Sequence, residues 1–484
     1  MARRAPAPAR PNILQVMGLF PSEFGGDSWN AWRVFLAALF GLPVTEAAVF
    51  REFTGRTTLP MAPFREAALV CGRRAGKSRI LALIAVYLAA FIDWLPWLAV
   101  GEVATVAVIA ADRRQARVVM RYVVGLLRQL PALAALIESE AAESVALRHR
   151  VTIEVATASL RVTRGYTFAA VLADECAFWP QDDSAEPDVE ILRAVRPGLL
   201  SLPGSMLLLA SSPYGKRGAL WEAFKKHYGQ DCAPVLVWRG ATLAMNPTMD
   251  RERIAADREA DPEAATAEYD ALFRSDVAGF LSRELIDSAI EPGRVVRPPQ
   301  EGIGYVAFAD PSGGMGDSFT AAVAHLQDGR AVLDALLEAR PPFNPQAVVA
   351  DVVALLRSYR VGMVTGDRYA AAWVTEAFAA AGMAYVHSAR DRSAIYLNAL
   401  PLFTSGRVDL LDHTRLAAQL ASLERRTGGG RDRVDHPPGG HDDLANSACG
   451  ALGLTAATKP LTFAPPLILR PDNWEHFSAR GIFA

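Results

Sequence analysis

One short segment of the chain combines glycines, a lysine and a hydroxyl residue in an order suited to phosphate binding. Residues 65–78 read REAALVCGRRAGKS. An apolar run comes first, a glycine-containing loop follows it, and Gly76-Lys77-Ser78 then leads into an apolar helical stretch. Backbone N–H groups at such a helix start can surround phosphates, the lysine can reach the β- and γ-phosphates, and the serine hydroxyl can bind Mg²⁺. Lysine is informative here because only five of the 50 basic residues are lysines. The sequence therefore predicts a nucleotide-binding loop, although Cys71 stands where the strict motif has glycine; its residues are Gly72, Arg73, Arg74, Ala75, Gly76, Lys77 and Ser78.

Two acidic residues follow another apolar run, at Phe168-Ala-Ala-Val-Leu-Ala-Asp174-Glu175. At the end of a strand, Asp174 would hold Mg²⁺ and Glu175 would polarise the attacking water. A third apolar run ends at Ser211 and Ser212, whose hydroxyls could sense the γ-phosphate. Each pattern alone is also typical of a turn at the end of a strand, and the loop alone of a strand–helix turn that binds no nucleotide. Their combination favours a P-loop ATPase with a Walker B element.

Two arginines could supply the positive charge that ATP hydrolysis needs in its transition state. Arg73 lies within the loop, and Arg164 precedes the expected Walker B strand, where it could act on a neighbouring subunit. An arginine in this role accelerates hydrolysis by about 10³–10⁵-fold. In a chain this rich in arginine, either residue could equally be a surface charge.

The second half of the chain carries three carboxylate positions. Asp310 and Asp367 each end an apolar run, and Asp442 and Asp443 begin a helical stretch. Clustered carboxylates suit two Mg²⁺ or Mn²⁺ ions about 3.5–4 Å apart, which stabilise the attacking and leaving oxygens of a phosphodiester. Taken singly, each aspartate is also a common turn or helix-cap residue. Together they predict a metal-dependent nuclease, with Asp317 either lining the site or capping a turn.

The elements that must position these residues alternate along the chain. The first half has short β-rich runs between helical ones, which predicts an α/β domain with a parallel, doubly wound sheet. Its strands are expected at residues 67–70, 104–110, 169–172 and 205–210, with helices beginning at Lys77 and Arg113.

The second half has the order of a ribonuclease H-like domain, in which three hairpin-linked strands precede alternating helices and strands. The expected strands are 305–309, 321–325, 331–337, 362–365 and 384–387, and the expected helices are 345–359 and 371–381. Residues 425–440 are interpreted as a loop rich in glycine and proline, followed by a helix from His441.

A chain of 484 residues exceeds the ~250–300 residues at which a single core stops growing. The main boundary is expected near residues 290–302, where proline and glycine accumulate. Five segments are predicted: a disordered lead-in (1–20), a P-loop ATPase domain (21–245), a helical lid or linker (246–300), a ribonuclease H-like nuclease domain (301–458) and a C-terminal tail (459–484).

Composition excludes several other classes of protein. The formal net charge is only −2, so the chain is no polycationic nucleic-acid arm, although a local basic channel stays compatible with this value. Four scattered cysteines do not form a disulfide scaffold or a CxxC zinc site, which favours a reducing cytosol. Residues 80–92 carry no charge but fall short of the ~18–20 residues that span a bilayer, so a buried core helix is expected.

With ATPase motifs first and a carboxylate nuclease second, the chain resembles the large terminase subunits of tailed bacteriophages. These are the motor-nucleases that cut concatemeric genomes and pump DNA into the prohead. Residues 71–78 are similar to the family's degenerate Walker A, Ala173-Asp174-Glu175 to its Walker B, and Ser211-Ser212-Pro213 to its coupling motif. His441-Asp442-Asp443 resembles its third nuclease motif.

The resemblance also implies cofactors, partners and further site residues. ATP and Mg²⁺ would be the cofactors, with Mn²⁺ able to replace Mg²⁺ in the nuclease site. The partners would be double-stranded DNA, a small terminase subunit and the portal protein, with a homo-pentamer on the prohead in the bacterial cytoplasm and Arg164 as a trans-acting finger. The segment around Trp32 resembles the family's adenine-side segment, with Arg33 in place of glutamine. Asn246-Pro247 and Glu268-Tyr269 resemble its linker or lid.

Two other functions compete with this interpretation. An ATP-dependent helicase-nuclease of DNA repair would need further arginine and glutamine motifs after residue 215, which the sequence lacks. A non-enzymatic, nucleotide-sensing assembly protein would require both acidic sets to be coincidental.

Overall fold

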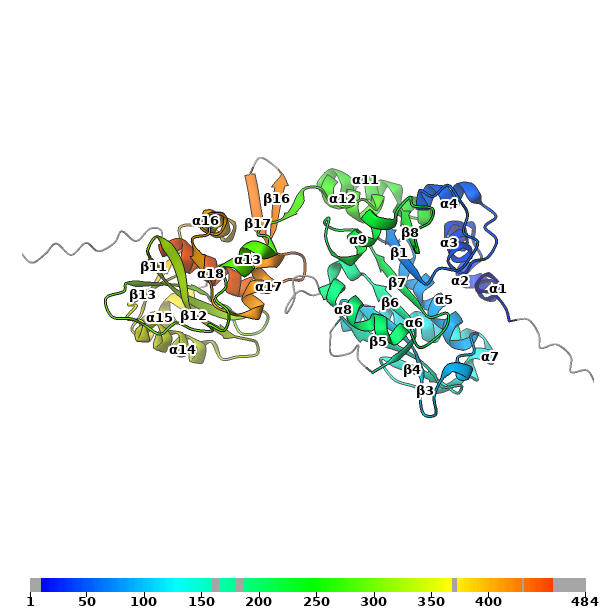
Figure 1. Ribbon diagram of the computed structural model, residues 1–484, viewed down its shortest axis with the longest axis horizontal. Helices are drawn as coiled ribbons and strands as arrows, with labels where there is room; N and C mark the ends of the chain where they lie inside the picture. The colour runs from blue at the N-terminus through cyan, green and yellow to red at the C-terminus, as the bar shows by residue number, and fades with distance from the viewer. Residues whose placement is uncertain (1–9, 159–164, 180–186, 368–371, 429–430, 456–484) are drawn as a thin grey trace, which may run out of the picture. The chain divides into compact units, whose positions relative to one another are not determined.

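The computed structural model describes residues 10–158, 165–179, 187–367, 372–428 and 431–455 of the 484-residue chain. The chain divides into two compact units (Figure 1). Among the described residues, the first unit comprises those within 10–287, 392–394 and 413–445, and the second comprises those within 288–391, 395–412 and 446–455. Residues 392–394 and 413–445, which the sequence-based division places with residues 301–458, group with the first unit.

The first unit is built on an eight-stranded sheet, as the predicted α/β class requires. Its strand order is β3-β4-β5-β2-β6-β7-β1-β8, parallel from β5 to β8, with β3 and β4 added antiparallel at one edge. The strands are β1 (Glu66–Cys71), β2 (Ala104–Ala110), β3 (Ile137–Glu140), β4 (Ser144–Leu147), β5 (Val151–Thr157), β6 (Thr167–Asp174), β7 (Met206–Ser211) and β8 (Val235–Gly240). Because β7 lies between β1 and β6, Ser211 and Ser212 at its carboxyl end lie between the loop after β1 and the acids at the end of β6.

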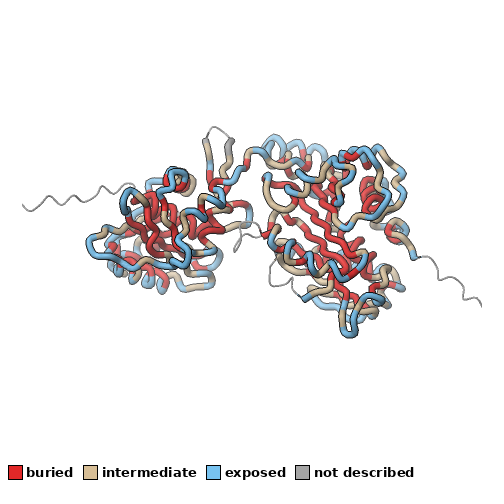
Figure 2. Tube along the Cα trace, viewed as in Figure 1, coloured by how far each residue is buried: buried red, intermediate tan, exposed pale blue. Residues whose placement is uncertain are grey.

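The central strands of this sheet are largely buried (Figure 2). Their side chains are apolar on both faces, so helices cover both faces of the sheet. Alternate residues of β1 belong to two different cores: Leu69 packs toward one face and Val70 toward the other. The first face is covered by α3 (Asn30–Leu39), α5 (Lys77–Ala90) and α6 (Arg113–Gln129), and the second by α8 (Pro187–Val195) and α9 (Gly218–His227).

Several further helices of the first unit are short. They are α4 (Ala47–Thr54), α7 (Pro131–Ala134), α10 (Thr242–Met245), α11 (Arg251–Ala260), α12 (Pro262–Asp270), α13 (Arg283–Ala289) and α17 (Thr414–Ser422). The helix α5 is buried along nearly its whole length, as expected for residues 80–92, and in the described part of the chain no helix is both long and apolar enough to cross a membrane.

Two sequence-based expectations fail in the first unit. Residues 13–18 and 21–24 form helices α1 (Ile13–Gly18) and α2 (Pro21–Phe24), whose apolar side chains enter the core, so the disordered lead-in predicted for residues 1–20 is too long. Residues 425–440 are not simply a loop, because β16 (Glu424–Gly428) and β17 (Arg431–Asp435) form a hairpin. β16 also pairs with β9 (Val277–Gly279), and this distant pairing leaves no local signal in the sequence.

The second unit contains a six-stranded sheet in the order β14-β13-β10-β11-β12-β15. In chain order, β10, β11 and β12 are antiparallel neighbours, and β13 and β14 continue the sheet in parallel on the other side of β10. The strands are β10 (Tyr305–Asp310), β11 (Phe319–Gln327), β12 (Arg330–Ala339), β13 (Met363–Gly366), β14 (Ala384–His387) and β15 (Val408–Asp409).

Helices α14 (Pro345–Ser358) and α15 (Ala372–Ala380) cover one face of this sheet. Helix α18 (Asp443–Thr455) lies against β10, since a side-chain carbon at Gly450 would collide with the ring of Phe308. Helix α16 (Arg392–Thr404) completes the described elements. The predicted C-terminal tail, residues 459–484, lies outside the described residues.

Candidate nucleotide site and carboxylate sites

The predicted phosphate-binding loop runs from the end of β1 to the start of α5. Gly76 adopts a positive φ of 102° and caps α5, whose first residue is Lys77. This conformation favours glycine, and the space is restricted too, because an added side-chain carbon would lie 3.2 Å from the indole nitrogen of Trp32. The backbone N–H groups at the start of α5 are therefore presented at the loop, as phosphate binding requires.

Trp32 supports this loop rather than lining the site. Its side chain is fully buried, and its indole Nε1 donates a 2.8 Å hydrogen bond to the carbonyl oxygen of Ala75. Trp32 is not among the residues that line the cavity, and its contact with the nucleotide stays a prediction. Arg33 donates to the backbone oxygens of Phe24 and Gly26, so it braces the N-terminal helices. Ser28 and Trp29, from the same segment, do line the cavity.

Lys77 connects the loop to the acids and serines predicted to act with it. Its ammonium lies 3.3 Å from Glu175 Oε1 and donates to Ser212 Oγ at 3.1 Å. Glu175 Oε2 in turn accepts from Ser211 Oγ at 3.0 Å and from the backbone N–H of Ser212 at 3.1 Å. Lys77 is buried, so its charge is compensated largely by this one carboxylate and by nearby carbonyl oxygens.

Asp174 and Ser78 supply the oxygens expected for Mg²⁺. Ser78 Oγ donates to Asp174 Oδ2 at 3.3 Å, while Asp174 Oδ1 is buried and has no hydrogen-bond partner among the described residues. Burial raises the pKa of Asp174 above its ordinary value, and the neighbouring charge of Glu175 raises it further. A buried carboxylate oxygen without a partner, next to a hydroxyl, fits a hard cation that prefers oxygen ligands.

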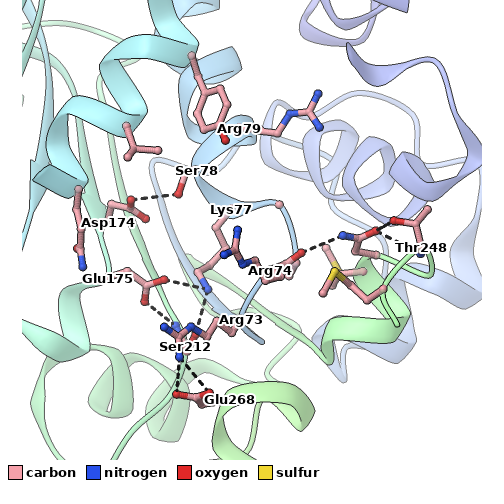
Figure 3. Close-up of a pocket in the computed structure, with 18 of the residues that line it drawn as sticks. Arg73, Arg74, Lys77, Ser78, Arg79, Asp174, Glu175, Ser212, Thr248 and Glu268 are labelled. Atoms are coloured by element: carbon pink, nitrogen blue, oxygen red, sulfur yellow. Dashed lines mark hydrogen bonds and ion pairs between the residues drawn. The ribbon is translucent and has the colours of Figure 1, made fainter. Parts of the chain in front are cut away.

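These residues open into one cavity of about 800 Å³ (Figure 3). Asp174 and Glu175 lie on one side of Lys77 and Thr248 lies on the other (Figure 3). The cavity is lined by residues from the loop, from α6, from the segment after α10 and from the stretch 413–445. Examples are Gln115, Tyr122, Asn246, Met249 and Pro438. A cavity of this size is within the range of pockets that hold a cofactor.

The predicted arginines have different environments. Arg73 forms an ion pair with Glu268 of α12, with NH1 3.0 Å from Oε1, so the loop contacts the predicted lid. Arg74 has a positive φ of 64° and lines the cavity, and Asn246 donates to its backbone oxygen. Arg164 lies outside the described residues.

Sequence reasoning missed Arg79, which also lines the cavity. It pairs with Glu23, and its guanidinium lies 4.8 Å from the centroid of the Trp29 ring. The only signal for Arg79 in the local sequence is its position two residues after Lys77. Its acidic and aromatic partners, Glu23 and Trp29, come from short helical segments that follow the predicted lead-in.

In the second unit, two predicted carboxylates meet at the edge of the sheet. Asp310 ends β10 and Asp367 follows β13, and these parallel strands pair with Ala309 opposite Gly366. Both aspartates are buried, and the backbone N–H of Asp367 donates to the oxygen of Ala309. The register thus fixes the two backbones side by side.

The neighbours of this pair are polar and buried. Asn446 of α18 donates to Asp310 Oδ2 at 2.8 Å, and the Tyr385 hydroxyl donates to the backbone oxygen of Asp367 at 3.3 Å. The pKa of Tyr385 is raised by burial and then by the charges of both aspartates. Sequence reasoning missed both neighbours, which carry no motif of their own.

Asp442 and Asp443 belong to the first unit at the start of α18. Both are buried, and Asp442 Oδ1 lies 3.0 Å from Arg392 NH1. The start of the helix is held by Gln419, whose side-chain oxygen accepts from the N–H groups of Leu444 and Ala445. Among the described residues, no group of three or more His, Cys, Asp or Glu side chains is arranged to hold a metal ion.

The chain was compared with known proteins at the level of sequence and structure. No protein-family model and no curated protein matches it. Solved structures do match. The large terminase of bacteriophage HK97 is 16% identical with a TM-score of 0.36, over 81% of this chain and 91% of that one. The large terminase of a thermophilic bacteriophage is 12% identical with a TM-score of 0.36, over 83% and 96% of the two chains.

A third structure matches a smaller part of the chain. It is the large terminase nuclease from another thermophilic phage, G20c, which is 22% identical with a TM-score of 0.31, over 34% of this chain and 94% of that one. All three come from bacteriophage large terminases. The 12% identical terminase has also been solved with ADP and with ATP-γ-S, and the G20c nuclease with magnesium and with cobalt.

Proposed function

We propose that this protein is the large subunit of a viral genome-packaging terminase, in which ATP hydrolysis drives double-stranded DNA into a prohead and a metal-dependent endonuclease cuts the concatemer. The observation that carries the ATPase assignment is the set of contacts around Lys77. Lys77, Glu175 and Ser212 contact one another, and Ser78 contacts Asp174, all in the same cavity. A strand–helix turn without nucleotide gives no reason to bury a lysine beside two acids.

In the proposed ATPase site, different residues have different roles in ATP hydrolysis. The loop N–H groups and Lys77 bind the phosphates, Ser78 and Asp174 hold Mg²⁺, and Mg²⁺ supplies charge neutralisation at the phosphate oxygens. Glu175 orients and polarises the attacking water. Lys77 pairs with Glu175 here, so the arrival of phosphate oxygens would draw Lys77 away and release Glu175 for the water. Arg73, if released by Glu268, would provide transition-state charge.

In the nuclease site, Asp310 and Asp367 would form the fixed part of a metal centre. Asp442 and Asp443 are the further candidate ligands, carried by the start of α18. Mg²⁺, or Mn²⁺ in its place, would stabilise the attacking and leaving oxygens of the phosphodiester. The carboxylate oxygens are the type of ligand that these cations prefer.

The partners follow from the proposed function. They would be double-stranded DNA, the portal protein and a small terminase subunit, with a homo-pentamer docked at the prohead in the bacterial host. In that ring, Arg164 would be the candidate trans-acting finger. A helicase-nuclease of DNA repair and a non-enzymatic, nucleotide-sensing assembly protein are the alternatives.

Two variants in parallel test the pair of activities. Lys77→Ala is expected to abolish ATP turnover but leave Mn²⁺-dependent plasmid degradation, whereas Asp310→Ala is expected to do the reverse. Turnover that survives in Lys77→Ala, or cutting that survives in Asp310→Ala, would reject the corresponding site. Unwinding of a forked duplex by the wild-type chain would favour the helicase-nuclease, and absence of both activities would favour the assembly protein.

A further inference from the structure

The turn that follows β7 is held by a residue from more than two hundred positions further along the chain. The Tyr214 hydroxyl donates a 2.7 Å hydrogen bond to Glu424 Oε2, and Arg217 forms an ion pair with Glu424 Oε1. Glu424 is the first residue of β16 and is fully buried. Tyr214 comes only two residues after Ser212, so this contact lies directly behind the serines that bind Glu175 and Lys77.

The buried carboxylate makes this contact specific. A buried charge is costly unless it is paired, so the geometry of its partners is tightly constrained. Arg217 pairs with Glu424 Oε1, whereas Tyr214 donates to Oε2 and Arg426 lies 3.4 Å from the same oxygen. Burial and the charge of Glu424 raise the pKa of Tyr214, so the phenol stays protonated and remains a donor.

A second connection joins the same turn to the same hairpin. The backbone N–H of Arg274 donates to the oxygen of Tyr214 at 2.8 Å. A few residues later, β9 pairs with β16, with Val277 opposite Arg426 and Gly279 opposite Glu424. Backbone contacts through Arg274 and β9, and side-chain contacts through Glu424, therefore both connect the turn after β7 to β16. A shift of this turn has to move β16 or break a buried ion pair.

We propose that Glu424 is a positioning residue for ATP hydrolysis. Through Tyr214 and Arg217 it fixes residues 211–214, whose serines hold Glu175 and Lys77, and it thereby couples the nucleotide state to the β16–β17 hairpin. This inference rests on the proposed ATPase function. Coupling of this kind is reciprocal: a change at the nucleotide alters the hairpin, and a change at the hairpin alters the nucleotide site.

The test uses the full chain with Glu424→Gln and, as the milder change, Tyr214→Phe, which removes one hydrogen bond and keeps the buried ion pairs. Both variants are expected to lower kcat about tenfold. The KM for ATP is expected to stay within about twofold of the wild-type value. Tyr166→Phe is the matched control, because Tyr166 also donates to a glutamate, Glu154 of β5, at 3.2 Å, and it precedes the amino end of β6, away from Asp174 at the carboxyl end. This control is expected to leave kcat unchanged.

Hydrogen exchange separates positioning from simple stabilisation. In the wild type, amide protection of β16 is expected to differ between the ADP-bound and ATP-γ-S-bound chain, and Tyr214→Phe is expected to abolish this difference. Unchanged kcat in both variants, or equal protection of β16 in both nucleotide states, would overturn the proposal. A wild type that fails to hydrolyse ATP would reject the proposed function itself, whereas a normal wild type with normal variants would reject only the role of Glu424.

Discussion

The nucleotide site and the carboxylate site differ in how the chain assembles them. The loop, the acids and the serines end three adjacent parallel strands, β1, β7 and β6, so one sheet fixes all of them within a single unit. Of the carboxylates in the proposed nuclease site, only Asp310 and Asp367 are placed side by side, by the two adjacent strands β10 and β13. The other two candidates begin a helix that is held by Gln419 and Arg392 of the first unit.

This difference indicates which site is ready for its ligand. In the nucleotide cavity, Lys77 contacts Glu175 and Ser212, and Ser78 contacts Asp174. In the proposed reaction, phosphate would replace Glu175 as the partner of Lys77. In the second unit, the register provides a fixed pair of carboxylates. Preorganised charge is the main source of catalytic power in such sites. We therefore expect substitutions to act most strongly in the first site, and the following predictions test this order.

The largest effect is expected from Glu175→Gln, which removes the group that polarises water but keeps its size. The kcat for ATP hydrolysis should fall by about 10²–10⁴-fold, the usual contribution of general-base catalysis. Binding of ATP, measured by a fluorescent analogue, should persist because Lys77 and the loop are unchanged. Glu140→Gln, which affects an exposed ion pair with Arg128, is the control. A normal kcat would contradict the assignment of Glu175.

The next effect concerns the carboxylate pair. Asp310→Asn should lower Mn²⁺-dependent plasmid cutting by about 10²-fold or more, since a charged ligand that stabilises the transition state is lost. Asp317→Asn, in the loop after β10, should have a smaller effect, because no neighbouring strand places it beside the pair. Equal loss in both variants would show that the pair formed by β10 and β13 is not the centre of the site.

Lys77→Arg tests whether this position requires lysine, which is rare among the basic residues of the chain. The charge is retained, but the guanidinium is larger and planar, and the buried ammonium of Lys77 lies 3.0 Å from the oxygen of Cys71 and 3.1 Å from Ser212 Oγ. We expect ATP turnover to fall by about 10²-fold, as for loss of one preorganised donor. Wild-type turnover in Lys77→Arg would mean that only the charge matters.

The smallest effect is expected from Trp32→Phe. This change removes the hydrogen bond to Ala75 and keeps an aromatic ring in the core, so it should cost about 0.5–1.5 kcal/mol of unfolding free energy and raise KM for ATP a few-fold. Trp94→Phe is the matched control, because its indole donates to the oxygen of Leu88 at the same distance but far along α5 from the loop. The control should lower stability without changing KM; a KM shift in both would indicate a general loss of packing.

Much of the fold is predictable because its signals are local. The strands predicted at residues 104–110 and 384–387 have the same bounds as β2 and β14. Apolar runs that end in Gly, Ser or Asp mark parallel strands and their carboxyl ends, where ligands bind. The residues Lys77, Asp174, Glu175 and Ser212 can therefore be identified from type and spacing alone.

What the sequence by itself determined was the chemistry: which residues can bind phosphate, hold a divalent cation or polarise water, and the order of the strands that carry them. Tertiary structure alone decided their supports and partners. It buried Trp32 beneath the loop, paired Arg73 with Glu268, and brought Glu424 to Tyr214 from the start of a hairpin where the sequence predicts a loop. The physical reason is the range of the interactions, because turn and strand preferences act between near neighbours, whereas buried hydrogen bonds and ion pairs join residues whose separation along the chain leaves no pattern.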